Sequence, residues 1–276
     1  MITKSNIRKI IFISIFFATS LFSFEFFWEQ DDDNITDANK SVIQDKNVSQ
    51  KIELAYRGKK PRVVIIIDDV SSRKQLKRIQ ALPMKVTPSI FPPFQHSRSS
   101  HKLAEGLEHY MVHLPMQSGR VFDRQSGTLK ITDSQKKMEA RVKEIRRFFP
   151  TARYINNHTG SVFTHNCKAT KMLYGTLRKE GFIFVDSLTT ASSKVAKAAH
   201  SFGDAYVSRD IFIDNKQTIR YIHRQLRRAV KIAKKNGYAI VIGHPYSITM
   251  KALKNVKDIF KDVEVVYIDE IYRKRK

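Results

Sequence analysis

Polar or titratable side chains follow directly after six short apolar runs of the sequence. The groups are Asp68 and Asp69; His113; Asn156, Asn157 and His158; Asp186 and Ser187; Arg209 and Asp210; and His244. Aspartate, asparagine and serine are favoured helix N-caps, so Asp186, Ser187 and Asp210 also fit a structural role. Histidine is not a favoured N-cap, and the three histidines together with the aspartate pair favour a functional site.

Such a cluster of carboxylates and imidazoles supports few kinds of chemistry. One carboxylate and two imidazoles form a common ligand set for a hydrolytic Zn²⁺ that keeps a position free for water. The metal acidifies that water and polarises a carbonyl, and a second carboxylate can accept the water's proton. Because consecutive strand residues point to opposite faces, Asp68 and Asp69 can share a site only at a strand end, where the chain turns.

Strand and helix patterns alternate from Pro61 to the end of the chain. Apolar runs predict strands within residues 63–68, 84–91, 109–114, 152–156, 182–186, 204–214, 238–244 and 263–269. Amphipathic patterns predict helices at residues 73–81, 97–108, 134–149, 167–180, 192–202, 216–236 and 247–261. This alternation predicts βαβ units and a parallel sheet, closed into an irregular (β/α) barrel, with an open doubly wound sheet as the alternative. In a barrel the active site lies at the carboxyl ends of the strands.

Composition limits the class of protein. The 276 residues are 42% hydrophobic, which is enough for a sizeable core and excludes disorder of the whole chain. A single cysteine excludes an internal disulfide framework. The 50 Lys and Arg against 26 Asp and Glu give a charge of +24, which predicts attraction to an anionic partner or a solvated basic surface. The sequence carries no nucleic-acid-binding motif, and we expect no nucleic-acid partner.

The first 60 residues differ from the rest. Residues 1–28 hold a basic start followed by the apolar run IIFISIFFATSLFSF, which predicts a secretory signal or an anchor. Bulky phenylalanines at the expected cleavage site favour an uncleaved inner-membrane anchor. The protein is then exported, with its remainder on the periplasmic or cell-envelope side. Residues 29–60 are acidic and polar, which is typical of a flexible linker, and residues 61–276 form the predicted catalytic domain.

The motifs together resemble the divergent polysaccharide deacetylases, relatives of the NodB-homology carbohydrate esterases. The matching pieces occur in family order: IIIDDV (65–70), HLPMQ (113–117), NNHTGSVFT (156–164), FVDSLTTASS (184–193), SRDIFIDN (208–215) and IGHPYSIT (242–249). The resemblance implies a deformed (β/α) barrel of seven or eight units. It also implies metal-dependent removal of acetyl groups from an N-acetylated envelope glycan, with peptidoglycan as one candidate.

The resemblance also implies roles for individual residues. By position, Asp68 resembles the catalytic base, Asp69 the aspartate ligand, and His113 the first histidine of the metal-binding HxxxH motif. His244 resembles the general acid, and Asp186 resembles a carboxylate that orients this acid or binds substrate. Supporting or substrate-binding positions are implied for Asn156, Asn157, Ser187, Arg209, Asp210 and Gln117.

One position departs from the family pattern. Gln117 stands where the second histidine of HxxxH is expected, and where the divergent branch is expected to carry a glutamate. Glutamine is a poor zinc ligand, so His158 is predicted to complete the ligand set for a divalent metal, with Zn²⁺ expected. His165 and Cys167 are alternative ligands, although a surface histidine and a small core cysteine are the more ordinary roles. Without a third ligand, the alternative is a catalytically inactive glycan-binding or envelope-scaffold protein on the same barrel.

Overall fold

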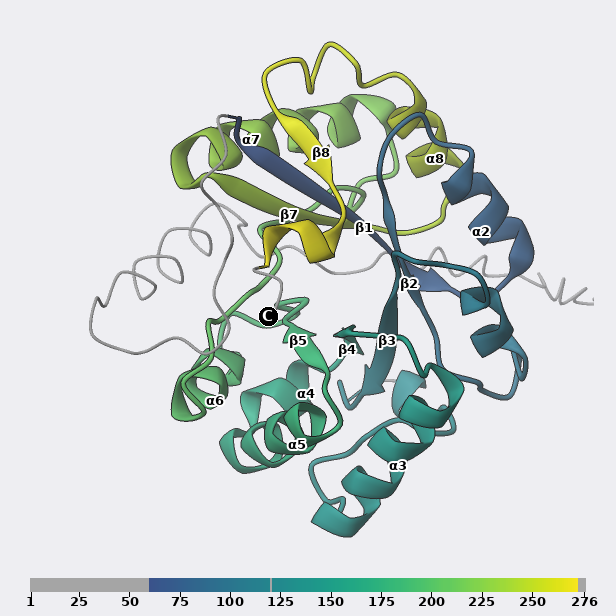
Figure 1. Ribbon diagram of the computed structural model, residues 1–276, viewed down its shortest axis with the longest axis vertical. Coiled ribbons are helices and arrows are strands. Elements are labelled where there is room, and N and C mark those ends of the chain that lie inside the picture. Colours follow the sequence, from purple (N-terminus) through teal and green to yellow (C-terminus); the bar gives the residue numbers. More distant parts are fainter. Residues whose placement is uncertain (1–59, 120, 273–276) are drawn as a thin grey trace, which may run out of the picture. The chain divides into compact units, whose positions relative to one another are not determined.

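The computed structural model describes residues 60–119 and 121–272, all of which belong to one compact unit of the chain, Asp31–Lys276 (Figure 1). The predicted anchor, and the predicted linker up to residue 59, lie outside the described residues. Within residues 60–119 and 121–272, no helix is long and apolar enough to span a membrane.

Eight parallel strands form the sheet. In chain order they are β1 (Arg62–Val70), β2 (Thr87–Ile90), β3 (Met111–Met116), β4 (Tyr154–Thr159), β5 (Ile183–Val185), β6 (Ile211–Phe212), β7 (Tyr238–Gly243) and β8 (Glu264–Val266). The spatial order is β5-β4-β3-β2-β1-β7-β6, with β8 paired to β1. Strand β7 pairs with one edge of β1. The other edge of β1 pairs with β8 along Arg62–Val64 and with β2 from Ile66 onward.

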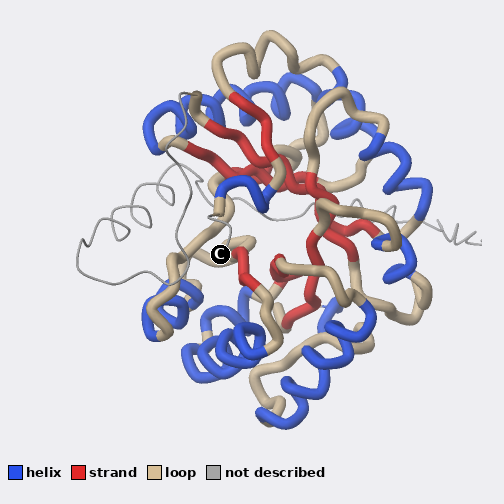
Figure 2. Tube along the Cα trace, in the orientation of Figure 1, coloured by secondary structure: helices blue, strands red, loops and turns tan. Residues whose placement is uncertain are grey.

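Helices surround this sheet, as Figure 2 shows. The α-helices are α2 (Arg73–Gln80), α3 (Gln135–Phe148), α4 (Ser161–His165), α5 (Cys167–Lys179), α6 (Val195–Ser201), α7 (Ile219–Asn236) and α8 (Ser247–Lys254). Short 3₁₀ turns are η2 (Ser100–Ala104), η3 (Val121–Arg124) and η4 (Ile268–Ile271). The predicted helix at residues 97–108 is wrong, because only the η2 turn forms there.

Backbone hydrogen bonds close the sheet into a ring beyond β5. The Asp186 N–H donates to the Val207 carbonyl at 2.9 Å, and the Arg209 N–H donates to the Asp186 carbonyl at 2.9 Å. The next residue, Asp210, donates its N–H to the Ile240 carbonyl of β7 at 2.8 Å. The deformed (β/α) barrel is therefore confirmed, and the open doubly wound sheet is wrong.

Strand alternation sorts the core into two layers. In β1, Val63, Ile65 and Ile67 pack outward against the helices, whereas Val64 and Ile66 face the barrel interior. The interior cluster also holds Met111, Tyr154, Ile183, Val185, Val207, Tyr238, Ile240, Ile242, Val266, Ile268, Ile271 and Tyr272. The segment around η4, near the carboxyl end of the described residues, therefore fills part of the barrel interior. All five apolar residues at 63–67 are fully buried.

Helix α7 shows how local signals set the outer layer. The Thr218 hydroxyl accepts from the Tyr221 N–H at 3.2 Å and caps the start. Gly237 ends the helix in the left-handed region, with φ of 88°, a conformation that favours glycine. The buried face carries Ile222, Gln225, Leu226, Ala229, Val230 and Ala233, which leaves the arginines and lysines on the outer side.

Ile268 tests whether the η4 segment is part of the core. Ile268→Ala removes a side chain that is 1% exposed inside the barrel, and we expect it to lower the free energy of unfolding by about 2–5 kcal/mol. Ile131→Ala is the matched control, because Ile131 is 37% exposed, and we expect a change within about 0.5 kcal/mol. Urea denaturation measures both, and equal losses would contradict the placement.

Candidate metal centre

The interior face of the barrel changes from apolar to polar towards the carboxyl ends of the strands. Two residues beyond Ile66, Met111, Tyr154 and Ile242, the interior positions are taken by Asp68, His113, Asn156 and His244. His158 follows Asn156 by another two residues on β4, and Ser187 follows Val185 beyond β5. Because these strands are parallel and in register, the polar side chains meet at one end of the barrel.

Asp69 joins this group through an irregularity in β1. Strand alternation would turn its side chain outward, away from Asp68. The pairing of β1 with β2 shifts register between Ile67 and Val70, and Asp69 has a φ of 59°, in the left-handed region. A bulge of this kind re-aims a side chain. The strand therefore does not end at the aspartate pair, as the sequence predicted, but runs on to Val70.

Three ligand atoms converge at this end of the barrel. Asp69 Oδ1 lies 3.2 Å from His113 Nε2 and 3.0 Å from His158 Nδ1. The two imidazole nitrogens are 3.1 Å apart. Among the described residues, Asp69, His113 and His158 are the group whose ligand atoms lie close enough together to hold a metal ion, all within 4.8 Å of one another.

The donor set fits a divalent cation. Asp69 Oδ1 is buried and no group in the described part of the chain meets it in hydrogen-bonding geometry. Burial alone would raise the pKa of Asp69, but the charge of His158 and the close approach of His113 hold that pKa well below its usual range. A carboxylate that stays ionised and two imidazoles aimed at one point are a common zinc ligand set.

The amide of Asn156 orients two members of the site. Its Oδ1 accepts from His113 Nδ1 at 2.9 Å and from the Ser89 hydroxyl at 2.7 Å. Its Nδ2 donates to both oxygens of Asp68, at 2.9 and 3.1 Å, and to the Ser187 hydroxyl at 3.1 Å. With the Nδ1 proton of His113 directed to the amide, a neutral ring presents the lone pair of Nε2 towards Asp69.

Asp68 is a buried carboxylate beside the three ligands. It is 2% exposed and lies 3.6 Å from His113 Nδ1. Burial raises the pKa of Asp68 above its ordinary value, although His113 and the Asn156 amide oppose the shift. A carboxyl with a raised pKa is suited to accept a proton near neutral pH.

His244 is paired with a carboxylate that the sequence did not single out. Asp214 Oδ1 lies 3.0 Å from His244 Nδ1, and its Oδ2 accepts from the His244 N–H at 2.7 Å and from the Thr249 hydroxyl at 2.8 Å. Burial alone would lower the pKa of His244, but Asp214, followed by Asp69 and Asp68, raises it to about 9.

The predicted strand at residues 204–214 explains why Asp214 was missed. Only Ile211–Phe212 pair as β6, so the polar residue beyond this strand is Asp214 rather than Arg209 or Asp210. The apolar run before Asp214 was the sequence signal that could have identified this residue. That run pairs with β7 next to the end that carries His244. The orienting role implied for Asp186 is therefore filled by Asp214 in this geometry.

Asp186 and Asn157 face away from the barrel interior. Asp186 accepts from the Leu188 N–H at 2.8 Å and from the Ser193 and Tyr206 hydroxyls at 2.7 and 3.0 Å. Asn157 accepts from the Ser187 N–H at 2.8 Å and donates to the Thr159 carbonyl at 2.6 Å. Both side chains stabilise the turns beyond β4 and β5.

Arg209 and Asp210 also support the backbone. Arg209 donates to the carbonyls of Ser187 and Leu188, at 2.8 and 2.9 Å, and Asp210 accepts from the Ile240 N–H at 2.8 Å. Leu188 and Thr159 have φ of 47° and 52°, a strained conformation for residues other than glycine. The bonds from Arg209 and Asn157 therefore hold strained turns that border the site.

His165 and Cys167 do not belong to the ligand group, and the amide oxygen of Gln117 is engaged elsewhere. Gln117 Oε1 accepts from the Ile131 N–H at 3.0 Å, so its amide is bound to the loop before α3. His165 is exposed, with Nδ1 2.8 Å from the Ser192 hydroxyl. Cys167 is exposed at the start of α5, so the expected core position for it is wrong.

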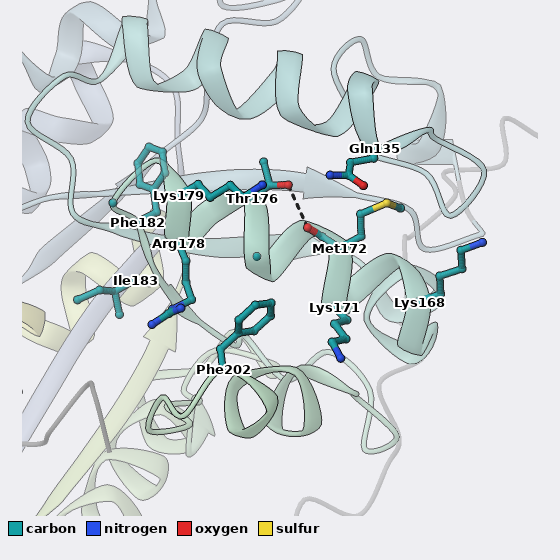
Figure 3. Close-up of a pocket in the computed structure, with 12 residues that line it drawn as sticks. Gln135, Lys168, Lys171, Met172, Thr176, Arg178, Lys179, Phe182, Ile183 and Phe202 are labelled. Atoms are coloured by element: carbon teal, nitrogen blue, oxygen red, sulfur yellow. Dashed lines mark hydrogen bonds between the residues drawn. The ribbon is translucent and has the colours of Figure 1, made fainter. Parts of the chain in front are cut away.

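A separate hollow of about 720 Å³ lies along α5 (Figure 3). Its lining includes the basic residues Lys168, Lys171, Arg178 and Lys179 and the apolar residues Met172, Phe182 and Phe202. The described residues that line it include no aspartate, glutamate, histidine or cysteine, so this hollow offers neither a metal site nor a general base.

The chain is similar to known proteins in sequence and in fold. A family model described as divergent polysaccharide deacetylase matches residues 65–272. An uncharacterized protein of Haemophilus influenzae is 28% identical over 219 residues, 78% of this chain and 78% of the relative. The uncharacterized protein YibQ of Escherichia coli is 28% identical over 197 residues, 71% of this chain and 62% of the relative. The crystal structure of an uncharacterized Agrobacterium tumefaciens C58 protein has a TM-score of 0.66 at 20% identity. It covers 77% of this chain and 89% of its own, and shows the same fold.

Replacing Asn156 tests how the site is oriented. Asn156→Ala removes the acceptor for His113 Nδ1, and we expect the affinity for Zn²⁺ to fall about 10–100-fold, as for other partners that orient a metal ligand. Asn157→Ala is the matched control, because this neighbour bonds to the outer turns, and we expect an unchanged affinity. Competition with a zinc chelator measures both, and equal affinity losses would contradict the orienting role.

Proposed function

Because the chain belongs to the divergent polysaccharide deacetylase family, we propose that it is a metal-dependent hydrolase that removes N-acetyl groups from an envelope polysaccharide. The observation that carries this proposal is the convergence of Asp69, His113 and His158 on one point beside the buried carboxyl of Asp68. Asp214, followed by Asp69 and Asp68, raises the pKa of His244 to about 9, which supports a protonated imidazole as the proton donor.

Each polar side chain has a place in the hydrolysis of an amide. Asp69, His113 and His158 would hold the cation, which when bound polarises the amide carbonyl and lowers the pKa of a water molecule. Asp68 accepts a proton from the attacking water as the new C–O bond forms. His244, kept protonated by Asp214, donates its proton to the nitrogen as the C–N bond breaks. The products are acetate and the free amine of the sugar.

The compartment is part of the proposal. The apolar segment in residues 1–28 supports export and anchoring in the inner membrane, with the barrel on the periplasmic or envelope side. Peptidoglycan is then an accessible N-acetylated polymer, and the charge of +24 favours approach to anionic envelope components. Gln117 motivates the alternative, an inactive glycan-binding or envelope-scaffold protein. The position of His158 Nδ1, close to Asp69 Oδ1 and His113 Nε2, supports the hydrolase over this alternative.

Asp69→Asn tests the metal and the reaction together. The substitution removes the charge of the carboxylate ligand, and we expect it to abolish both bound metal and acetate release from N-acetylated glycans. The wild-type protein is expected to hold about one zinc per chain. Asp262→Asn is the control, because Asp262 pairs with Lys234 on the surface. Metal analysis by plasma mass spectrometry and an acetate assay measure the outcome, and retention of both properties in Asp69→Asn would disprove the proposal.

The pH profile tests the role of His244. Its imidazolium form, which donates the proton, is present below the pKa of about 9 and is lost as the pH rises through that value. We therefore expect kcat/KM to fall above about pH 9. Asp214→Asn removes the main cause of the raised pKa, so the fall should move to lower pH by about 1–3 units. If kcat/KM of Asp214→Asn falls at the same pH as that of the wild-type protein, another group donates the proton.

A further inference from the structure

Tyr246 is an exposed aromatic side chain at the edge of the polar site. In the described part of the chain, the large apolar side chains exposed to this degree are Tyr246, at 39%, and Ile131, at 37%. The Tyr246 ring centroid lies 5.5 Å from that of His244, with a 34° angle between the rings. An exposed ring next to His244 is therefore placed to contact the part of a ligand that extends from the site towards solvent.

The Tyr246 side chain does not stabilise the start of α8. Tyr246 is the N-cap residue of α8, but its side chain makes no capping hydrogen bond. Its hydroxyl has no hydrogen-bond partner among residues 60–119 and 121–272. Partial burial, with the charges of Asp69 and Asp214, raises the pKa of Tyr246 to about 12, so the hydroxyl keeps its proton and can donate it to a ligand.

Aromatic rings also border the site on the other side of β1. Phe91, beyond β2, presents its ring edge-on to His113 and His158, with centroid distances of 5.1 and 4.8 Å. Phe94 lies 5.4 Å from Phe91. Since β2 and β7 pair with opposite edges of β1, the aspartate pair has Phe91 on one side and Tyr246 on the other.

We propose that Tyr246 binds the sugar ring next to the one whose acetamido group reacts, so that the site selects linked sugars over a single sugar. This inference rests on the proposed function. The reacting amide must reach both the three ligands and His244, and Tyr246 lies two residues beyond His244 towards solvent. The flat face of a pyranose carries C–H groups that pack against the negative face of an aromatic ring. The phenol hydroxyl can donate to the hydroxyls at the edge of the same sugar.

Chain-length dependence tests this role. The measurement is kcat/KM for acetate release from N-acetylglucosamine and from its β-1,4-linked tetramer. Tyr246→Ala should lower the value for the tetramer by about tenfold more than the value for the monomer, the worth of one aromatic contact. Tyr246→Phe keeps the ring and should retain most of the preference for the tetramer. Tyr221→Ala, on the outer helix α7, is the control and should change neither value.

A binding titration separates failure of this inference from failure of the proposed function. If the zinc-loaded wild-type protein releases no acetate from either sugar, the hydrolase proposal fails, and calorimetric binding of the tetramer then decides the role of Tyr246. Weaker binding by Tyr246→Ala, but not by Tyr246→Phe, supports the inference. Equal losses of kcat/KM on monomer and tetramer, unchanged tetramer binding in Tyr246→Ala, or no tetramer binding by the wild-type protein would overturn it.

Discussion

A single buried amide ties the two halves of the candidate site together. Asn156 is 0% exposed, and its two polar atoms bond to side chains from β1, β2 and β3 and from the turn beyond β5. A buried amide left without these partners would cost about 1–3 kcal/mol for each unmade hydrogen bond. The amide therefore stays in one orientation, which fixes Asp68 and His113 relative to each other.

The pKa values of two adjacent carboxyls are shifted in opposite directions. Asp68 lies in the interior with an amide and one imidazole, and burial raises its pKa. Asp69 is turned by the bulge in β1 towards two imidazoles, which outweigh its burial and lower its pKa. Environments that separate the pKa values of neighbouring acids typically assign them different chemical roles. The same division, one ligand and one proton acceptor, is what metal-assisted hydrolysis of an amide needs.

The apolar run before each polar group accounts for what the sequence could predict. It placed Asp68, His113, His158 and His244 beyond apolar strands, and parallel pairing brings them to one end of the barrel. Alternation could not separate Asn156 from Asn157 until the interior face was known. The bulge at Asp69 depends on pairing with β2, and Asp214 was hidden because β6 is only two residues long. The position of Gln117 depends on a loop contact with Ile131, which no local pattern encodes.

The central claim is that His158, and not Gln117, completes the metal site. Zinc affinity of the wild-type protein, His158→Ala and Gln117→Ala, measured by competition with a chelator, tests it most directly. The geometry predicts one tight site in the wild-type protein, loss of that site in His158→Ala, and little change in Gln117→Ala. His158 Nδ1 lies within reach of Asp69 Oδ1 and His113 Nε2, whereas the amide oxygen of Gln117 accepts from the Ile131 N–H. Tight zinc binding that survives in His158→Ala and disappears in Gln117→Ala would contradict the account.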